Sequence, residues 1–195
     1  MSIKFQLRPQ KSVQVAAMFL KLEQLYKKQP MHHLKLMKML YMADRRSLEQ
    51  IETTMTGDRY VSMEFGPVLS NVYNLIKGEY SDANDQALWS THISPRCIHR
   101  ITLLKDPGNS KLCEFEEDLI RDIYEEYKDW DRFDLAEETH KLFPEWEKPP
   151  EGIGSIPIKI ETTLRYIGKT AEDIQEIEET VKYYIHQDRV LVHAH

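Results

Sequence analysis

The sequence has little that would support a disulfide-stabilised, membrane-spanning or nucleotide-binding protein. Cysteine occurs only twice in 195 residues, and Cys97 and Cys113 match neither a zinc spacing nor a Cys-x-x-Cys redox motif, which favours a reducing compartment. No apolar run approaches the roughly 20 residues that span a bilayer, and residues 1–10 are too polar for a signal peptide. The seven glycines form no phosphate-binding motif. We expect a cytoplasmic protein that contacts no membrane and needs no cofactor.

Histidine is plentiful, but its spacing argues against a metal site. No two histidines stand at the i, i+4 spacing with an acidic companion that zinc-binding helices use. The eight are His32, His33, His92, His99, His140, His186, His193 and His195. Asp129, Asp131 and Asp134 have the rhythm of a calcium loop without its central glycine and final glutamate, so one of them is better explained as a helix N-cap. We expect no metal.

Charge is unevenly divided between the two halves of the chain. The total is −6, but residues 1–105 hold 15 basic and 9 acidic side chains, whereas residues 106–195 hold 11 basic and 23 acidic ones. A general nucleic-acid footprint is therefore not indicated. Two explanations remain open: the halves attract each other across the fold, or the acidic half faces a basic partner.

Hydrophobic periodicity predicts a mainly helical, α+β protein. Residues 15–26 carry one apolar face and end at Gln29-Pro30, while residues 31–50 are apolar on too wide a surface for a helix that faces solvent. We expect the second segment to be the central, mostly buried helix. Further helices are predicted around residues 115–127 and 134–143, and a strongly acidic one over residues 170–186.

The remaining segments are assigned by breakers and β-formers. Residues 53–66 suggest a short strand or extended loop, and Pro67 is placed as the first residue of a short helix that ends at Gly78. Residues 88–104, rich in Trp, Thr, Ile and Leu, predict two strands joined by a turn. We therefore predict a compact helical domain with a small antiparallel β element over residues 1–150. Residues 151–195, after a Pro/Gly-rich linker, are predicted to be a helical extension packed on the same domain.

One dense polar and aromatic group stands out at residues 38–68. If the central helix is followed by a segment that returns against it, Asp44, Asp58 and Arg59 are expected to form an ion-pair network, with Tyr60 and Phe65 packed beneath. The alternative is that an arginine and two aromatic side chains on a turn form a protein–protein hot spot. A less favoured third interpretation makes Asp44, Asp58 and Arg59 the acid, base and anion clamp of an enzyme.

The same residues carry a resemblance to a known family. Lys-Leu-x-Lys-Met-Leu-Tyr-Met-Ala-Asp (35–44), Thr-Gly-Asp-Arg-Tyr-Val (56–61) and Phe-Gly-Pro-Val (65–68) resemble the Panacea domain of SocA-like antitoxins. A second patch agrees with the family signature, and consists of Leu135, Thr139-His140, Pro144 and Trp146. The resemblance covers roughly residues 12–150.

This resemblance implies a non-enzymatic, mainly helical antitoxin that neutralises a toxin encoded nearby by direct binding. The alternative is a proteolytic adaptor that delivers the toxin to a protease. Some members of the family carry a DNA-binding helix-turn-helix segment ahead of the domain. Here only about ten residues precede the first predicted helix, so no direct DNA binding is expected. The motif residues that define the fold or bind the partner are Tyr41, Asp44, Asp58, Arg59, Tyr60, Phe65, Gly66 and Pro67. The candidate interface residues are Trp130, Phe133, His140 and Trp146.

Overall fold

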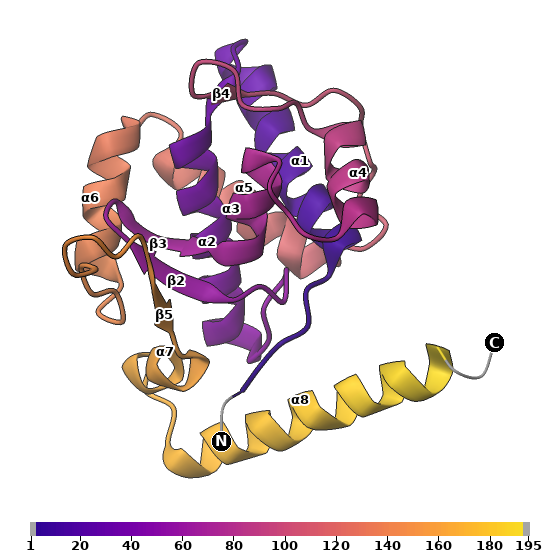
Figure 1. The fold of residues 1–195 in the computed structure, drawn as a ribbon, viewed down its shortest axis with the longest axis vertical. Helices are drawn as coiled ribbons and strands as arrows, with labels where there is room; N and C mark the ends of the chain where they lie inside the picture. The colour runs from indigo at the N-terminus through magenta and orange to yellow at the C-terminus, as the bar shows by residue number, and fades with distance from the viewer. Residues whose placement is uncertain (1–2, 193–195) are drawn as a thin grey trace.

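The computed structural model describes residues 3–192, with side chains from residue 3 to residue 187. Within this part of the chain the helices are α1 (Pro9–Lys27), α2 (His33–Ile51), α3 (Ser70–Lys77), α4 (Ala83–His92), α5 (Glu114–Tyr127), α6 (Arg132–Leu142), α7 (Ile160–Tyr166) and α8 (Ala171–Val192). The strands are β1 (Met31–His32), β2 (Tyr60–Met63), β3 (Gly66–Leu69), β4 (Arg100–Ile101) and β5 (Ile156–Ile158). The prediction of a mainly helical α+β fold with a small antiparallel β element is confirmed (Figure 1). His193 and His195 lie outside the described residues.

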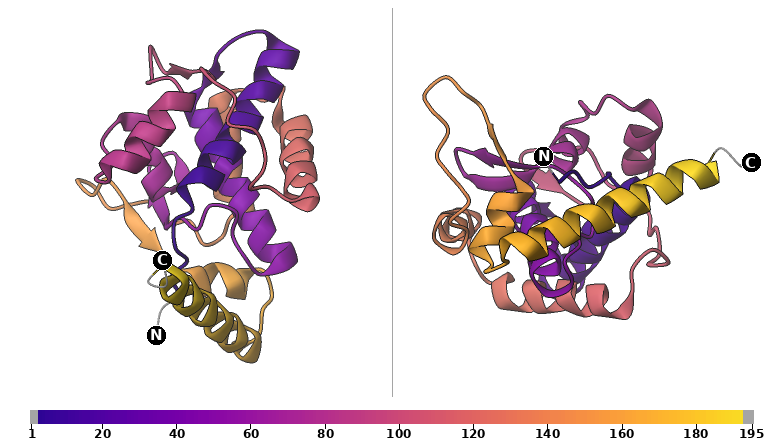
Figure 2. Two further views of the ribbon diagram at one scale, coloured as in Figure 1. Left: turned by 90° about the vertical axis from the view of Figure 1, so that its right-hand side faces the viewer. Right: turned by 90° about the horizontal axis from the view of Figure 1, so that it is seen from below.

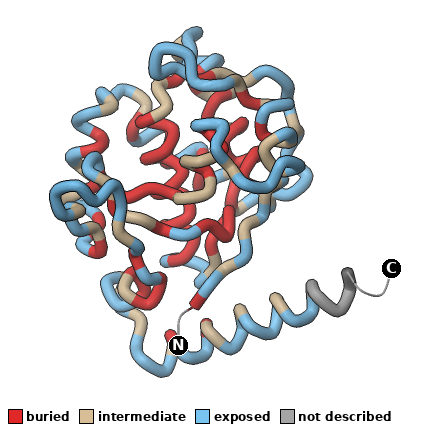
Figure 3. Tube along the Cα trace, viewed as in Figure 1, coloured by how far each residue is buried: buried red, intermediate tan, exposed pale blue. Residues whose placement is uncertain are grey.

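Helix α2 is the centre around which the other elements pack. Every residue from Leu34 to Arg45 is buried, including charged ones, and the buried part of the chain gathers around this helix in Figure 3. The helix begins where the His32 side chain accepts a hydrogen bond from the Leu34 amide, and it ends at Glu52, which has a left-handed backbone. Helices α1, α5 and α6 and strand β3 contact it, so the prediction of a central helix over residues 31–50 is confirmed.

Two small antiparallel sheets lie beside α2. One has the strand order β3-β2-β5, with Ser62 opposite both Pro67 and Ile156, and the other pairs β1 with β4. Strand β3 is an edge strand, which is where a proline can stand without breaking a ladder hydrogen bond. The turn between β2 and β3 brings the Phe65-Gly66 segment towards α6, which contacts β3.

The segment after residue 150 returns to the body of the protein before it leaves in α8. Strand β5 adds to β2, and the amide of Ile3 donates to the Glu161 carboxylate of α7. Helix α8 then crosses one end of the body, as both views of Figure 2 show. Ile174 and Ile177 are buried, whereas most of the helix is exposed.

Ion pairs join the basic first half of the chain to its acidic second half. They are Lys11–Glu116, Lys21–Asp106, Lys27–Asp129, Arg45–Glu145 and Arg46–Glu126. Each exposed pair contributes little to stability, but together they show that oppositely charged side chains of the two halves meet within the fold. This supports the first of the two explanations offered for the charge asymmetry.

The expectation of two strands over residues 88–104 is only partly confirmed: Ile93 pairs with Leu103 and Cys97 with Arg100 in an irregular antiparallel hairpin that includes β4. The first part of this range belongs to α4, which begins at Asp82, whose carboxylate accepts hydrogen bonds from the amides of Asn84 and Asp85. The buried Trp89 anchors this helix to the core. Capping and the burial of one large side chain outweigh the β propensity of the Trp and Thr residues, because β propensity depends strongly on context.

Pro67 does not begin a helix, as the sequence suggested, because it pairs with Ser62 inside β3. Its carbonyl accepts a hydrogen bond from the Lys38 ammonium group at 2.9 Å. Helix α3 begins only at Ser70, where another side chain caps its first turn, as described below. The predicted left-handed end of that helix at Gly78 is confirmed, with φ +76°.

Candidate functional site

Among the described residues, the two aspartates of the motif accept hydrogen bonds from amide and hydroxyl groups and form no ion pair. Asp44 is fully buried and accepts hydrogen bonds from the amide of Thr56 at 2.9 Å and from its hydroxyl at 2.5 Å. Burial raises the pKa of Asp44 to about 7, although the bonds from Thr56 act in the opposite direction. Asp44 therefore ties the segment after α2 back onto that helix.

Asp58 caps helix α3 from a distance. Its carboxylate accepts hydrogen bonds from the amides of Arg59, Asn71 and Val72, at 2.6, 2.9 and 2.8 Å. Burial raises the pKa of Asp58 to about 6, against the effect of these bonds. The Arg59 guanidinium group instead donates to the Asn71 side chain. The expected ion-pair network of Asp44, Asp58 and Arg59 is therefore wrong: backbone amides, which sequence patterns do not show, take both carboxylates.

Tyr41 and Tyr60 belong to a buried aromatic layer, and Phe65 does not. The rings of Tyr41 and Tyr60 meet edge to face at 5.0 Å, and the Tyr41 hydroxyl donates to Glu145 at 3.0 Å. Arg45 donates to the same Glu145 oxygen, also at 3.0 Å. Phe65 is 52% exposed, so the expectation that it packs beneath the loop is wrong. Glu145 was missed because its partners lie about a hundred residues earlier in the chain.

His140 and Trp146, two of the candidate interface residues, pack on each other. Their rings stack at a centroid distance of 3.7 Å, and the Trp146 indole donates to the Met63 carbonyl at 2.9 Å. Trp130 is 40% exposed and lies edge to face against Tyr127. These contacts give His140 and Trp146 a role in holding the β2–β3 turn.

A cavity of about 520 Å³ lies between the β2–β3 turn, the start of α2 and the start of α6. It brings together Lys38, Phe65, Gly66 and Phe133 of the predicted segments. Phe65 and Phe133 are each 52% exposed, and their ring centroids are 6.4 Å apart. The cavity therefore has an exposed aromatic pair on its wall.

Basic and imidazole side chains supply the rest of this wall. The Arg132 guanidinium group lies 4.5 Å from the centre of the Phe133 ring, and its buried Nε has no hydrogen-bond partner among the residues that the structure describes. Arg96, His32, His33 and His99 also line the cavity, with Glu64 as its carboxylate. Burial, followed by the influence of His33, lowers the pKa of His32 to about 4. The cavity is suited to an anionic or aromatic group.

Lys38 reaches the same wall from the core. Among the described residues it takes part in no ion pair, and burial lowers its pKa to about 7. Gly66 leaves room for it: with φ +95°, a Cβ here would lie 2.9 Å from the Lys38 ammonium nitrogen and would overlap the Thr139 hydroxyl oxygen.

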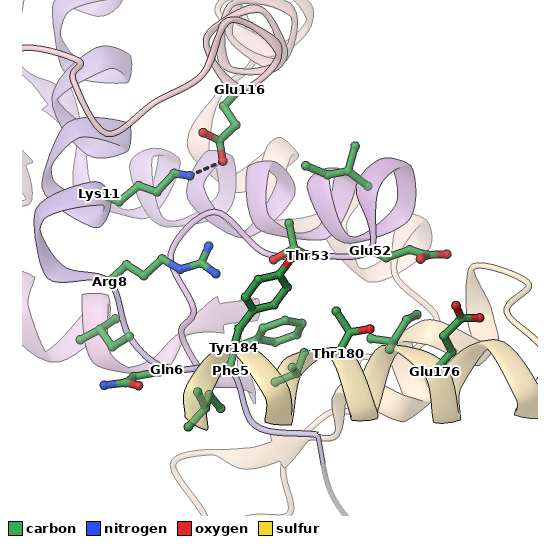
Figure 4. A pocket seen from close by; sticks show the side chains of 15 residues that line it. Phe5, Gln6, Arg8, Lys11, Glu52, Thr53, Glu116, Glu176, Thr180 and Tyr184 are labelled. Carbon is green, nitrogen blue, oxygen red and sulfur yellow. Dashed lines mark ion pairs between the residues drawn. The ribbon is translucent and has the colours of Figure 1, made fainter. Parts of the chain in front are cut away.

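A second cavity, of about 640 Å³, lies between the N-terminal arm and α8 (Figure 4). Phe5, Arg8 and Tyr184 contribute to it, and Lys11 forms an ion pair with Glu116 at 2.6 Å on its wall. None of the site residues expected from the sequence lines this cavity. The cavity at the β2–β3 turn is therefore the better candidate site.

The comparison with known families identifies the family of this chain. The family model described as "Antitoxin SocA-like, Panacea domain" matches residues 36–147, which is more than half of the chain. The chain belongs to this family. The comparisons with curated proteins and with solved structures give no match. Among the described residues, no helix is both long and apolar enough to cross a membrane.

The matched Panacea segment holds most of the site and leaves part of it outside. Lys38, Phe65, Gly66, His99 and Phe133 lie within residues 36–147, whereas His32 and His33 precede this range. Strand β5 and helices α7 and α8 follow it.

We expect Asp58→Asn to lower the free energy of unfolding by about 1–3 kcal/mol. Asparagine offers one acceptor oxygen where Asp58 uses two, so at least one amide at the start of α3 loses its partner. Urea unfolding would measure the effect, with the exposed Asp122→Asn as the control. Wild-type stability in Asp58→Asn would contradict the capping role.

Proposed function

We propose that this protein neutralises a cognate toxin by binding it directly in the cytoplasm, and that the cavity at the β2–β3 turn is the contact surface. Membership of an antitoxin family supports this proposal. The observation that carries the choice of surface is the exposed pair Phe65 and Phe133 beside Arg132, because aromatic and arginine side chains dominate binding hot spots. The matching surface of the toxin would be acidic and aromatic or aliphatic.

The test is co-expression of the chain with the product of its neighbouring gene. Growth rescue together with co-elution of the two proteins on a sizing column supports neutralisation by binding. Rescue without a complex, lost in a host that lacks the responsible protease, favours the adaptor alternative. No rescue contradicts the antitoxin function for this gene pair.

We expect Phe133→Ala to weaken toxin binding by about 2 kcal/mol or more, because the truncated side chain lies beside the cavity. The ring is half exposed, so the free energy of unfolding should change little. Tyr166→Ala is the matched control, since Tyr166 is 54% exposed and lies on α7, away from the cavity. Titration calorimetry measures the affinity of each variant for the toxin. Equal affinities of the two variants would place the interface elsewhere.

A further inference from the structure

Three histidines from two distant segments meet at the rim of the cavity. His32 and His33 join β1 to α2, and His99 lies just before β4. One nitrogen of each ring lies within 4.8 Å of the corresponding nitrogens of the other two. The ring centroids are 4.9–5.7 Å apart. Pairing of β1 with β4 creates this cluster, which explains why the spacing of histidines along the sequence does not show it.

The turn that presents His99 has an unfavourable backbone. Ile98 and His99 have φ +46° and +63°, and Cys97 pairs with Arg100 around them. Asn-Gly is typical of a two-residue turn with two positive φ angles, and a β-branched residue is unusual there. Ile98 is 88% exposed, so burial of its side chain does not explain the conformation. Such strain is concentrated at functional sites.

The hydrogen bonds of the histidine rings determine which ring nitrogens keep a free lone pair. The amide of His33 donates to the His99 carbonyl at 2.9 Å, and His33 Nδ1 lies 3.0 Å from the same oxygen. Because a carbonyl oxygen only accepts, Nδ1 carries the proton and Nε2 keeps a free lone pair. This carbonyl partner is typical of metal-ligating histidines. His32 Nδ1 accepts from the Leu34 amide at 3.2 Å, so ligation through Nε2 would require His32 to release that bond.

We propose that His32, His33 and His99 form a binding site for a transition metal ion such as Zn²⁺, with an open coordination position towards the cavity. Three neutral imidazoles suit Zn²⁺, Cu²⁺ or Ni²⁺, whereas Ca²⁺ and Mg²⁺ require oxygen ligands. Nitrogens in a tetrahedral zinc site are about 3.4 Å apart, so the three rings would have to rotate towards one another to hold the ion. Arg96 and Arg132, which line the same cavity, favour an anion as the fourth ligand.

The test is a titration of the full chain with Zn²⁺ against a chromophoric chelator. All proteins carry His193→Ala and His195→Ala, so that no terminal histidine adds a ligand. His99→Asn removes one imidazole but tolerates the left-handed turn, and His32→Asn removes another but retains an N-cap acceptor for α2. His92→Ala is the control, since His92 lies outside the cluster and contacts the Lys105 carbonyl.

We expect the parent to bind one Zn²⁺ per chain, and His99→Asn and His32→Asn each to weaken binding by at least about tenfold. His92→Ala should bind like the parent. Co²⁺ in place of Zn²⁺ should give the intense visible absorption of tetrahedral coordination. Thermal melts of the metal-free variants check that each is folded. An affinity that is equal in the parent and in His99→Asn, or no Zn²⁺ binding by the parent, overturns the proposal. Neither result bears on toxin binding by Phe133, so the two proposals fail separately.

Discussion

Replacing Lys38 by methionine is expected to stabilise the protein by about 2 kcal/mol at pH 6, because it removes a buried charge that has no counter-ion among the described residues. In the part of the chain that the structure describes, the ammonium group has one hydrogen bond, to the Pro67 carbonyl. Methionine has a similar length and no charge to desolvate. The lost hydrogen bond offsets part of the gain, by about 1 kcal/mol.

The advantage of the Lys38→Met variant should fall as the pH rises. Burial lowers the pKa of Lys38 from its ordinary 10.5 to about 7 in the folded protein. Between these two values the unfolded chain binds a proton that the folded protein does not bind, so the wild type gains stability with increasing pH. Below pH 7 both states are protonated and the wild type carries the full cost of the buried charge. The methionine variant lacks this titration.

Urea unfolding of both proteins at pH 6, 8 and 10 measures the difference. We expect it to be largest at pH 6 and to vanish or reverse by pH 10, where a neutral lysine keeps its bond to the Pro67 carbonyl. Lys148→Met, at an exposed position, controls for a general effect of removing a positive charge. A difference that is constant with pH would show that Lys38 is charged throughout, with a counter-charge that stabilises it.

How far the sequence predicted the fold depended on where the deciding interactions lie along the chain. Helix α2 was predictable because its apolar residues repeat within one segment, and the N-cap of α6 by Asp131 was predictable from adjacent residues. Helix α4 was missed because a single buried tryptophan, Trp89, outweighs the β propensity of its neighbours. The start of α3 was misplaced because its cap, Asp58, lies twelve residues before Ser70.

The residues of the candidate site were likewise predictable only where the deciding pattern lies within one short segment. Phe65, Gly66 and Phe133 were selected from the sequence, because the family motif or exposed aromatic character marks them. Arg96, Arg132 and the histidine cluster were not selected, since they meet only after β1 pairs with β4 and α6 packs on α2. Patterns within short segments therefore identified the residues of the β2–β3 turn and of α6. The basic and histidine side chains of the cavity come together only through contacts between segments that are distant in the sequence.

Substituting alanine for Gly66 is expected to lower the free energy of unfolding by about 3–5 kcal/mol. Two costs combine. The backbone has φ +95°, which disfavours any side chain, and the new Cβ would overlap the Thr139 hydroxyl oxygen and lie 2.9 Å from the Lys38 ammonium nitrogen. Thr139 is fully buried and hydrogen-bonded to the Ala136 carbonyl, so it has little room to move.

Gly78→Ala separates these two costs. Gly78 also has a positive φ, +76°, but a Cβ there would meet nothing within 4 Å. Its alanine variant should therefore lose only about 1 kcal/mol, the cost of the backbone conformation alone. The difference between the two variants, measured by urea unfolding under the same conditions, is the steric cost at Gly66. Equal losses would mean that the β2–β3 turn yields to the methyl group.

The Gly66→Ala variant also tests whether the β2–β3 turn belongs to the toxin-binding surface. The turn that must shift carries Phe65, and Gly66 lines the cavity next to Lys38. We expect toxin binding to be lost more completely than in Phe133→Ala, whereas Gly78→Ala should neutralise the toxin normally. Lowering the temperature restores the folded fraction of a destabilised variant but does not restore a displaced turn. Binding measured where Gly66→Ala is fully folded therefore distinguishes damage to the surface from loss of stability, and wild-type affinity there would exclude the β2–β3 turn from the interface.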